Sequence, residues 1–226
     1  MAVPQLIPVP QSNRITSFSS TDVATGKGYV TFYAGQTNGT PSLGLSLLQF
    51  YGDNVTSKTA TFVSSVLPTF TKRIDRDYDI DFKQTTIVEG LCFVNVPNGV
   101  QNGDSSGQNH QHYVFVRLRK WDGTTETEIA SAQGRTHANG SMAVNAEADT
   151  IDALSFTISS TKINAGESLR LTVEVWHHAG GAVNAKVFIG QDPKNRAVDE
   201  DAEADSHNWG TISTQITLQL PIKIEI

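Results

Sequence analysis

Residues 212–226, ISTQITLQLPIKIEI, show the most regular hydrophobic pattern of the chain. Apolar side chains and Thr214 fall on even positions, and polar side chains and Pro221 fall on odd positions. Such alternation with a period of two indicates an extended strand with one buried face, so we expect the even-numbered side chains from Ile212 to Leu220 to be buried. Pro221 has no N–H for a strand ladder and therefore predicts an edge or a bulge late in this strand.

Shorter segments of the same kind recur along the chain and are separated by clusters of Gly, Asn, Asp and Pro. We expect strands at residues 28–34, 43–51, 59–63, 73–82, 86–96, 112–121, 125–132, 151–159, 168–176 and 182–189. Helical periodicity is nearly absent, and residues 143–154 predict one helical turn at most. The sequence therefore predicts an all-β fold, a single antiparallel two-sheet β-sandwich of jelly-roll-like type over residues 26–226.

Composition excludes several classes of protein. The 226 residues carry 17 Lys and Arg against 23 Asp and Glu, and the resulting net charge of −6 argues against nucleic acid or an anionic membrane as partner. The single cysteine, Cys92, excludes an internal disulfide and a zinc site of several thiolates. No apolar stretch approaches the ~18 residues of a membrane span, and the first ten residues do not have the pattern of a Sec signal peptide.

The first 25 residues have a different composition from the rest. The first ten contain three prolines, which favour an extended backbone, and the remainder is polar and rich in Ser and Thr. Such a segment supplies no hydrophobic core of its own. We predict that residues 1–25 form an extended N-terminal arm that docks on a neighbouring molecule, with Leu6, Ile7 and Val9 as its apolar contacts.

Four aspartates, Asp75, Asp77, Asp79 and Asp81, alternate with largely apolar residues and so share one face of a predicted strand. They are candidate calcium ligands, because calcium prefers carboxylate oxygens. The alternative is a ladder of ion pairs with a neighbouring strand, for which residues 117–119 offer two arginines of one parity. We favour the ladder, because calcium loops curl around the ion and a flat strand does not.

Two further groups of residues have metal-ligating side chains. His110 and His112 share a face of a strand and could chelate one metal, but no complete zinc signature surrounds them, and we expect these histidines at strand ends. The acidic run at residues 199–205 could bind a divalent cation, but we favour an exposed solubilising loop. We therefore predict no metal site and no cofactor.

Motifs of catalysis are missing from the sequence. It contains no GxSxG, no GxxxxGK[ST] and no GxGxxG after a predicted strand. Cys92 lies in an apolar strand, where a thiol packs rather than attacks. Of the three tryptophans, we expect Trp176 to pack and Trp209 to be exposed beside the acidic run. We predict that the chain is not an enzyme.

Several phrases occur together and in order: FVNVP at 93–97, VFVRLRKWDG at 114–123, ETEIA at 126–130, AGESLRLTVEVW at 165–176 and FIGQDP at 188–193. This part of the chain resembles the β-sandwich virion proteins of tailed phages and related viruses, such as capsid decoration and minor capsid proteins. The resemblance implies a jelly-roll-like fold, self-association and a place on a capsid or tail, and it offers no catalytic residues.

The resemblance leads to a functional hypothesis. We expect a non-enzymatic viral structural protein, a capsid decoration or minor capsid subunit that stabilises the particle through oligomeric contacts. Its expected partners are further copies of itself, as a trimer, and other virion proteins such as a major capsid protein. The alternative is a carbohydrate-binding module or adhesin, which shares the fold, the acidity and the absence of catalytic motifs.

Overall fold

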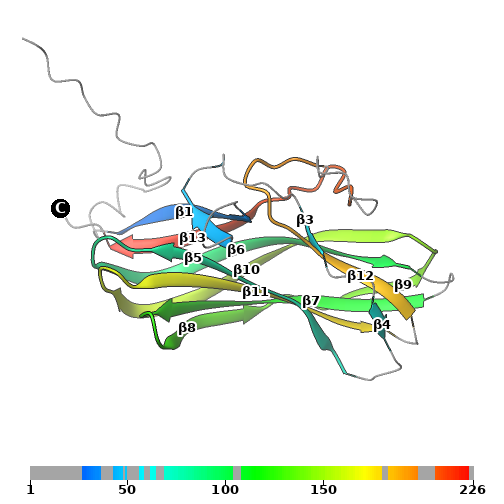
Figure 1. The fold of residues 1–226 in the computed structure, drawn as a ribbon, viewed down its shortest axis with the longest axis horizontal. Helices are drawn as coiled ribbons and strands as arrows, with labels where there is room; N and C mark the ends of the chain where they lie inside the picture. The colour runs from blue at the N-terminus through cyan, green and yellow to red at the C-terminus, as the bar shows by residue number, and fades with distance from the viewer. Residues whose placement is uncertain are drawn as a thin grey trace, which may run out of the picture.

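The computed structural model describes residues 27–36, 43–47, 49, 56–58, 62–64, 69–103, 108–179, 183–197 and 207–223. Within these ranges the chain forms thirteen strands and no α-helix, which confirms the all-β prediction (Figure 1). The strands are β1 Lys27–Gln36, β2 Leu43–Ser46, β3 Thr56–Lys58, β4 Phe62–Ser64, β5 Thr71–Asp81, β6 Thr86–Asn102, β7 Gln108–Trp121, β8 Glu126–Gln133, β9 His137–Met142, β10 Glu147–Ile163, β11 Ser168–Ala179, β12 Val183–Gly190 and β13 Ile216–Lys223.

Hydrogen bonding joins these strands into one sheet in the order β3-β12-β6-β13-β1-β2-β5-β11-β7-β8, with β10 on β6, β4 on β12 and β9 on β7. The ladders are antiparallel except that β2 meets β5 in parallel, at Gly44 opposite Asp79. This bridge differs from the predicted pair of separate antiparallel sheets.

Strand β13 confirms the pattern that predicted it. Ile216, Leu218 and Leu220 are buried, although the ladder covers residues 216–223 rather than the whole predicted range. The predicted bulge is also present, because the register of β13 on β6 shifts between Gln219 and Ile222. On β6, Gly90 has a φ of 126° and its Cα faces the Pro221 ring, a backbone conformation that suits glycine.

Two elements differ from the sequence-based expectation. The segment expected to form a helical turn is a tight turn followed by β10, with Asn145 at a φ of 58° and its N–H donating to the carbonyl of Asn102. Strand β9 was not predicted, because its sequence HANGSM has no alternating apolar residues. It forms because β7 offers it a ladder. The described residues contain no helix long and apolar enough to span a membrane.

The hydrophobic core draws on most of the long strands of this sheet. Strand β11 contributes Leu169, Leu171, Val173 and Val175, all fully buried, and β6, β7, β10 and β13 supply most of the other core residues. Strands β6 and β7, and likewise β8 and β10, contact one another without a ladder between them. The predicted N-terminal arm, including Leu6, Ile7 and Val9, lies outside the described residues.

Candidate functional site

The neighbouring strands β6 and β10 carry polar side chains on both faces of the sheet near the start of β10. Asp149 and Asp152 lie three residues apart on β10, so their side chains point to opposite faces of the sheet. Asp152 points inward and binds Asn98 of β6, whereas Asp149 points outward over Gly99. Each aspartate meets a histidine, so this region contains an outer and an inner histidine–carboxylate site.

The outer site consists of Glu147, Asp149 and His207. His207 Nε2 lies 3.0 Å from Asp149 Oδ1, and His207 Nδ1 lies 3.3 Å from Glu147 Oε1. The imidazole is fully buried, and Nδ1 makes no hydrogen bond of good geometry. One ligand atom from each of these three residues lies within 4.8 Å of the other two. In the part of the chain that the structure describes, this is the one such group of His, Cys, Asp and Glu side chains.

Aromatic side chains hold the His207 ring in place. Phe188 of β12 stacks on it with centroids 4.1 Å apart, and Trp209 meets it edge-on at 4.6 Å. Phe188 and Trp209 form a small hydrophobic cluster of their own, on which Ile212 packs. Trp209 is therefore buried, which corrects the expectation that it is exposed. Because the ring cannot turn freely, its two nitrogens are directed at the carboxylates.

Gly99 makes room for the Asp149 carboxylate. A Cβ at this position would overlap Asp149 Oδ1 and lie 3.2 Å from the carbonyl oxygen of Ala148. The absence of a side chain therefore lets the carboxylate lie across the β6 backbone, between β10 and the His207 ring. No local sequence pattern marks this site, because Asp149 and His207 are 58 residues apart along the chain.

The inner site is a row of histidines across three neighbouring strands. His177 of β11 lies opposite His112 of β7, and His112 lies opposite His137 of β9. His110 follows two residues away on the same face of β7. His110, His112 and His177 are fully buried, and the histidine pair lies near the first end of β7, as expected. We call His110, His112, His137 and His177 the histidine row.

Polar contacts within the histidine row are incomplete. His110 Nδ1 and His177 Nε2 lie 3.0 Å apart, and His137 Nε2 lies 2.9 Å from Asp152 Oδ1. Both ring nitrogens of His112 are buried without a hydrogen bond, as is Nε2 of His110. His112 instead stacks on His137, with ring centroids 5.1 Å apart.

Burial determines the charge of the histidine row. Burial, with smaller contributions from the neighbouring rings of His137 and His110, lowers the pKa of His112 to about 3. Burial likewise lowers the pKa of His177 to about 3, with smaller contributions from His110, His112, Arg73 and His178. At neutral pH these imidazoles are therefore uncharged, which lets them pack side by side.

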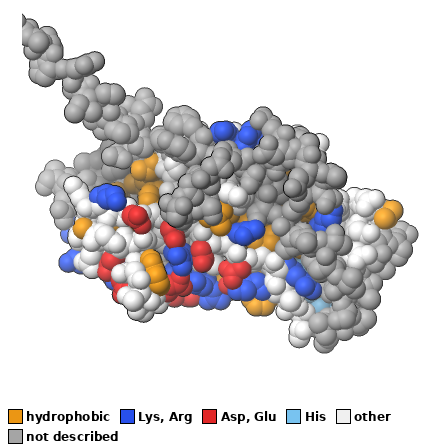
Figure 2. Space-filling model, in the orientation of Figure 1, with side chains coloured by type: hydrophobic (Ala, Val, Ile, Leu, Met, Phe, Trp, Pro, Cys, Tyr) orange, Lys and Arg blue, Asp and Glu red, His pale blue; other side chains and the backbone are white. Residues whose placement is uncertain are grey.

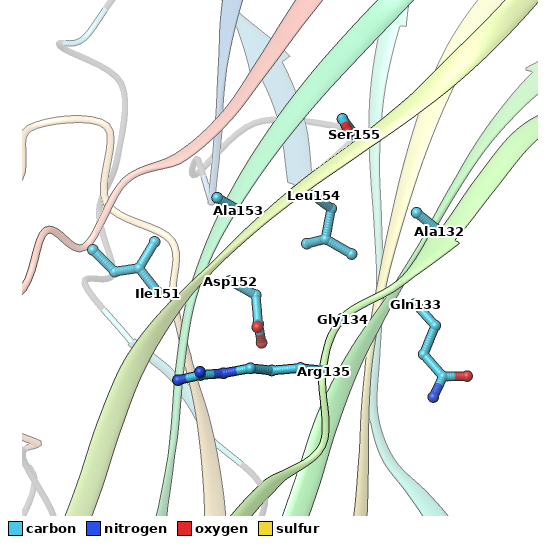
Figure 3. A pocket seen from close by; sticks show the side chains of 9 residues that line it. All are labelled: Ala132, Gln133, Gly134, Arg135, Ile151, Asp152, Ala153, Leu154 and Ser155. Atoms are coloured by element: carbon cyan, nitrogen blue, oxygen red, sulfur yellow. The ribbon is translucent and has the colours of Figure 1, made fainter.

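A pocket of about 380 Å³ opens beside the inner site. It lies between the end of β8 with its following loop, residues 132–135, and residues 151–155 of β10. Figure 3 shows the Asp152 side chain pointing from β10 toward Arg135. The Asp152 carboxylate already accepts hydrogen bonds from Asn98 and His137, and no nucleophile is directed at this pair among the residues that line the pocket.

The four aspartates of β5 lie on the charge-rich surface that β5, β11, β7 and β8 form (Figure 2). Arg170 of β11 donates to both oxygens of Asp79, at 2.7 and 2.8 Å, and approaches Asp77. Ser168 and Thr172 donate to Asp81 and Asp77, and Lys72 donates to Asp75. This matches the ladder interpretation, which the sequence favoured over a calcium site.

The cation of the ladder is not one of the two that the sequence suggested. Arg117 pairs with Glu174 and Glu128, because β11 separates β7 from β5. Arg119 pairs with Glu126. The alternation of residues along each strand correctly predicted which face the charged side chains occupy. It does not predict which strands are neighbours in the sheet.

Replacing Arg170 tests the ladder. We expect Arg170→Met to lower the free energy of unfolding by roughly 1–3 kcal/mol, because Asp77, Asp79 and Glu126 then face one another without their shared cation. Arg119→Met, which removes one exposed pair, should cost at most about 1 kcal/mol. Urea unfolding of both variants measures the difference, and equal losses would contradict the assignment of Arg170.

Two other candidates from the sequence have clear positions. Cys92 is buried in β6, and burial raises the pKa of its thiol to about 12, which confirms the packing interpretation. Trp176 is half-buried, stacks on Tyr113 and donates to Glu174, so it packs as expected. The acidic run at 199–205 lies outside the described residues.

Comparison with known proteins adds little at the level of sequence: no family model and no curated protein matches the chain. Solved structures match weakly. A CocE/NonD family hydrolase from Staphylococcus aureus has 13% identity and a TM-score of 0.46, over 88% of this chain and 37% of that one. A selenomethionine-labelled alpha-amino acid ester hydrolase has 8% identity and a TM-score of 0.45, over 85% of this chain and 36% of that one.

Viral capsid proteins also appear among the matches. The VP2 subviral particle of infectious bursal disease virus has 8% identity and a TM-score of 0.30, over 76% of this chain and 38% of that one. The chain thus spans little more than a third of the proteins that it matches.

These comparisons correct the functional hypothesis. A non-enzymatic virion subunit was predicted, but hydrolases score higher than the capsid protein, and no match supports a phage protein. The predictions of a structural virion protein and of a non-enzyme are therefore contradicted, and we do not retain them. The TM-scores all lie below 0.5, so the likeness to hydrolases does not assign an activity to this chain either.

Proposed function

We propose that this chain is a metal-binding β domain whose centre is Glu147, Asp149 and His207, and that it binds a divalent ion of the zinc type. The observation that carries the proposal is the convergence of three ligand atoms within 4.8 Å around a buried imidazole. The fold brings them together from β10 and from a distant segment that packs on the outer face of the sheet.

One ion bound by all three side chains takes one nitrogen of His207 and one oxygen of each carboxylate. Zinc–nitrogen and zinc–oxygen bonds of about 2.0–2.2 Å at a tetrahedral angle place two ligand atoms roughly 3.3 Å apart. Asp149 Oδ1 lies 3.0 Å from Nε2, whereas Glu147 Oε1 lies 3.3 Å from Nδ1 on the other side of the ring, so one of the two carboxylates has to turn toward the nitrogen that binds the ion. A ligand set of one imidazole and two carboxylates favours zinc, manganese or iron over calcium and magnesium, which prefer oxygen alone.

Three protein ligands leave a coordination position open. Sites of this kind hold a water or a substrate in the fourth position, whereas structural zinc sites have four protein ligands. Glu147 is the most exposed of the three, with 29% of its side chain accessible, so the open position lies toward solvent on its side. Gln101 donates to Glu147 Oε1 at 2.8 Å and orients this carboxylate.

Zinc titration tests the proposal. We expect one Zn²⁺ to bind per chain, with a change in Trp209 fluorescence, because Trp209 contacts the ligating ring. His207→Gln and Asp149→Asn should weaken binding by at least about 100-fold, since each removes a ligand. The milder Glu147→Gln keeps the shape of the most exposed ligand and should weaken binding while leaving the circular dichroism spectrum unchanged.

A matched control uses the inner site. His137→Gln removes a histidine from another histidine–aspartate pair and should leave zinc affinity unchanged. Without metal, the outer site is a buried imidazole that is hydrogen-bonded to Asp149 and lies beside Glu147. If the wild-type chain binds zinc no more tightly than His207→Gln does, this second arrangement is the correct one and the metal proposal is wrong.

We also propose that the continuous sheet is folded into two facing layers of jelly-roll-like type. The support is the set of contacts between strands that no ladder joins: β6 with β7, β8 with β10, and β11 with β12. The shared core residues of these strands lie between the two layers.

A further inference from the structure

The outer surface of β10, β6, β13 and β1 carries no charged side chain over two complete rows of the sheet. One row runs from Ser155 to Phe93, Gln219 and Thr31. The next consists of Ala153, Asn95, Thr217 and Tyr33. Together with their outward neighbours on the same strands, which are Ile151, Thr157, Leu91 and Tyr29, we call these residues the uncharged face.

This face exposes apolar area that the rest of the described surface does not. Four large hydrophobic side chains are exposed in the described part of the chain, and three of them, Leu91 at 42%, Phe93 at 37% and Ile151 at 42%, belong to the uncharged face. Tyr29 adds a second aromatic ring, 6.2 Å from that of Phe93. An apolar surface in one continuous patch indicates an interaction site.

The outer surface on the other strands differs, because it is rich in charged side chains. There, β5, β11, β7 and β8 present a dense network of ion pairs around Arg170, Arg117 and Arg119. A partner without charges is therefore suited to one surface only, because docking on the other would remove water from charged groups.

The sequence itself contains a segment that complements the uncharged face. Residues 1–13 contain no Asp, Glu, Lys or Arg, and three prolines alternate with apolar residues between positions 3 and 10. Prolines fix the backbone in an extended form, and such segments dock on exposed aromatic rings with little loss of entropy. Strand β1 begins at Lys27, two residues before Tyr29 of the uncharged face, so the chain before β1 is tethered close to this face.

We propose that residues 3–10 dock on the uncharged face, with Leu6, Ile7 and Val9 against Leu91, Phe93 and Tyr29. The sixteen residues between position 10 and β1 span up to roughly 50 Å, so the segment can reach its own molecule or a second copy. This inference is independent of the metal centre, of which Glu147 and Asp149 lie at the start of β10, before Ile151, and His207 lies on a separate segment.

Disulfide cross-linking of the full chain tests this docking. We expect Gln5→Cys combined with Ser155→Cys to cross-link on mild oxidation, because Ser155 is exposed at the centre of the uncharged face. The native Cys92 does not compete, since it is buried and its pKa is raised to about 12. A product with the mobility of a monomer assigns the segment to its own molecule, and one with the mobility of a dimer assigns it to a second copy.

The control places the second cysteine on the charged surface. Gln5→Cys with Glu128→Cys should cross-link at least about tenfold more slowly, a difference equivalent to ~1.4 kcal/mol. Equal rates for the two pairs, or no cross-link for the first, would show that the segment does not dock on the uncharged face. Removal of zinc should not change the result, so the two proposals fail separately.

A second measurement uses proteolysis at Arg14. Ala153→Glu with Ser155→Glu adds charge to exposed positions without removing a packed group, and we expect trypsin to cut at Arg14 about tenfold faster in this variant. Thr127→Glu with Ser131→Glu on β8 is the matched control and should leave the rate unchanged. An unchanged rate in the first variant would overturn the proposal.

Discussion

Lowering the pH from 7.5 to 5 is expected to reduce the free energy of unfolding by about 2 kcal/mol for each of His112 and His177. The folded state keeps these imidazoles neutral, with pKa values of about 3, whereas the unfolded chain protonates them near 6.5. The unfolded state therefore binds more protons below pH 6.5. Stability is complete above this pH and falls progressively as the pH decreases toward 3.

The surroundings of the two rings support this sign. The charges that act on them come from the other histidines of the row, from Arg73 and, as the smallest contribution, from His178 on the other face of β11, and all of these disfavour a positive charge. The Asp152 carboxylate is hydrogen-bonded to His137 in this row. Both orphaned nitrogens of His112 also lack an acceptor for a second proton.

Urea unfolding at pH 7.5 and at pH 5 measures the effect. His112→Phe keeps an aromatic ring but cannot titrate. Between pH 7.5 and pH 5 this variant should therefore lose about 2 kcal/mol less of its free energy of unfolding than the wild type does. This difference does not depend on the stability of the variant at pH 7.5. His178→Gln, on the opposite face of β11, is the control and should keep the wild-type dependence. Parallel pH profiles for wild type and His112→Phe would contradict the prediction.

The second large effect is expected at Asp192. The substitution Asp192→Ala should lower the free energy of unfolding by roughly 3–5 kcal/mol. Asp192 is fully buried and accepts hydrogen bonds from the backbone N–H groups of Lys194 and Arg196 and from the Arg196 guanidinium. The replacement leaves a partly buried cation and two amides without this acceptor.

The same carboxylate positions the segment that carries His207. The carbonyl of Ala197 accepts from Trp209 N–H, and the carbonyl of Arg196 accepts from the Thr214 hydroxyl. Loss of Asp192 should therefore also weaken zinc binding, although Asp192 is not itself a ligand. Asp192→Asn keeps one acceptor oxygen and should lose less stability than Asp192→Ala.

Chemical denaturation and zinc titration of the two variants test this prediction together. A loss of stability without any change in zinc affinity would show that the segment holds its position without Asp192. Stability equal to that of wild type for Asp192→Ala would contradict the role of the buried pair altogether.

Features that depend on neighbouring residues in the chain were predictable. The parity of β13, the bulge at Pro221 and the shared face of the four aspartates follow from a period of two, which is a local property of the backbone. Strand β9 was not predictable in this way, because its sequence does not alternate and only the free edge of β7 makes it a strand.

The functional groups depended on contacts between distant strands. His110 and His177 are 67 residues apart, Arg170 and Asp79 are 91 apart, and His207 and Asp149 are 58 apart. A sequence pattern states which face of a strand a side chain occupies, but it does not state which strands are neighbours.

The sequence by itself thus determined the all-β class, the buried face of each long strand and the uncharged composition of the first thirteen residues. The tertiary structure decided which cation pairs with the aspartates, which histidines meet and where three ligands converge. The physical reason is that alternation arises from the geometry of one strand, whereas partners are selected by strand order and register across the whole sheet.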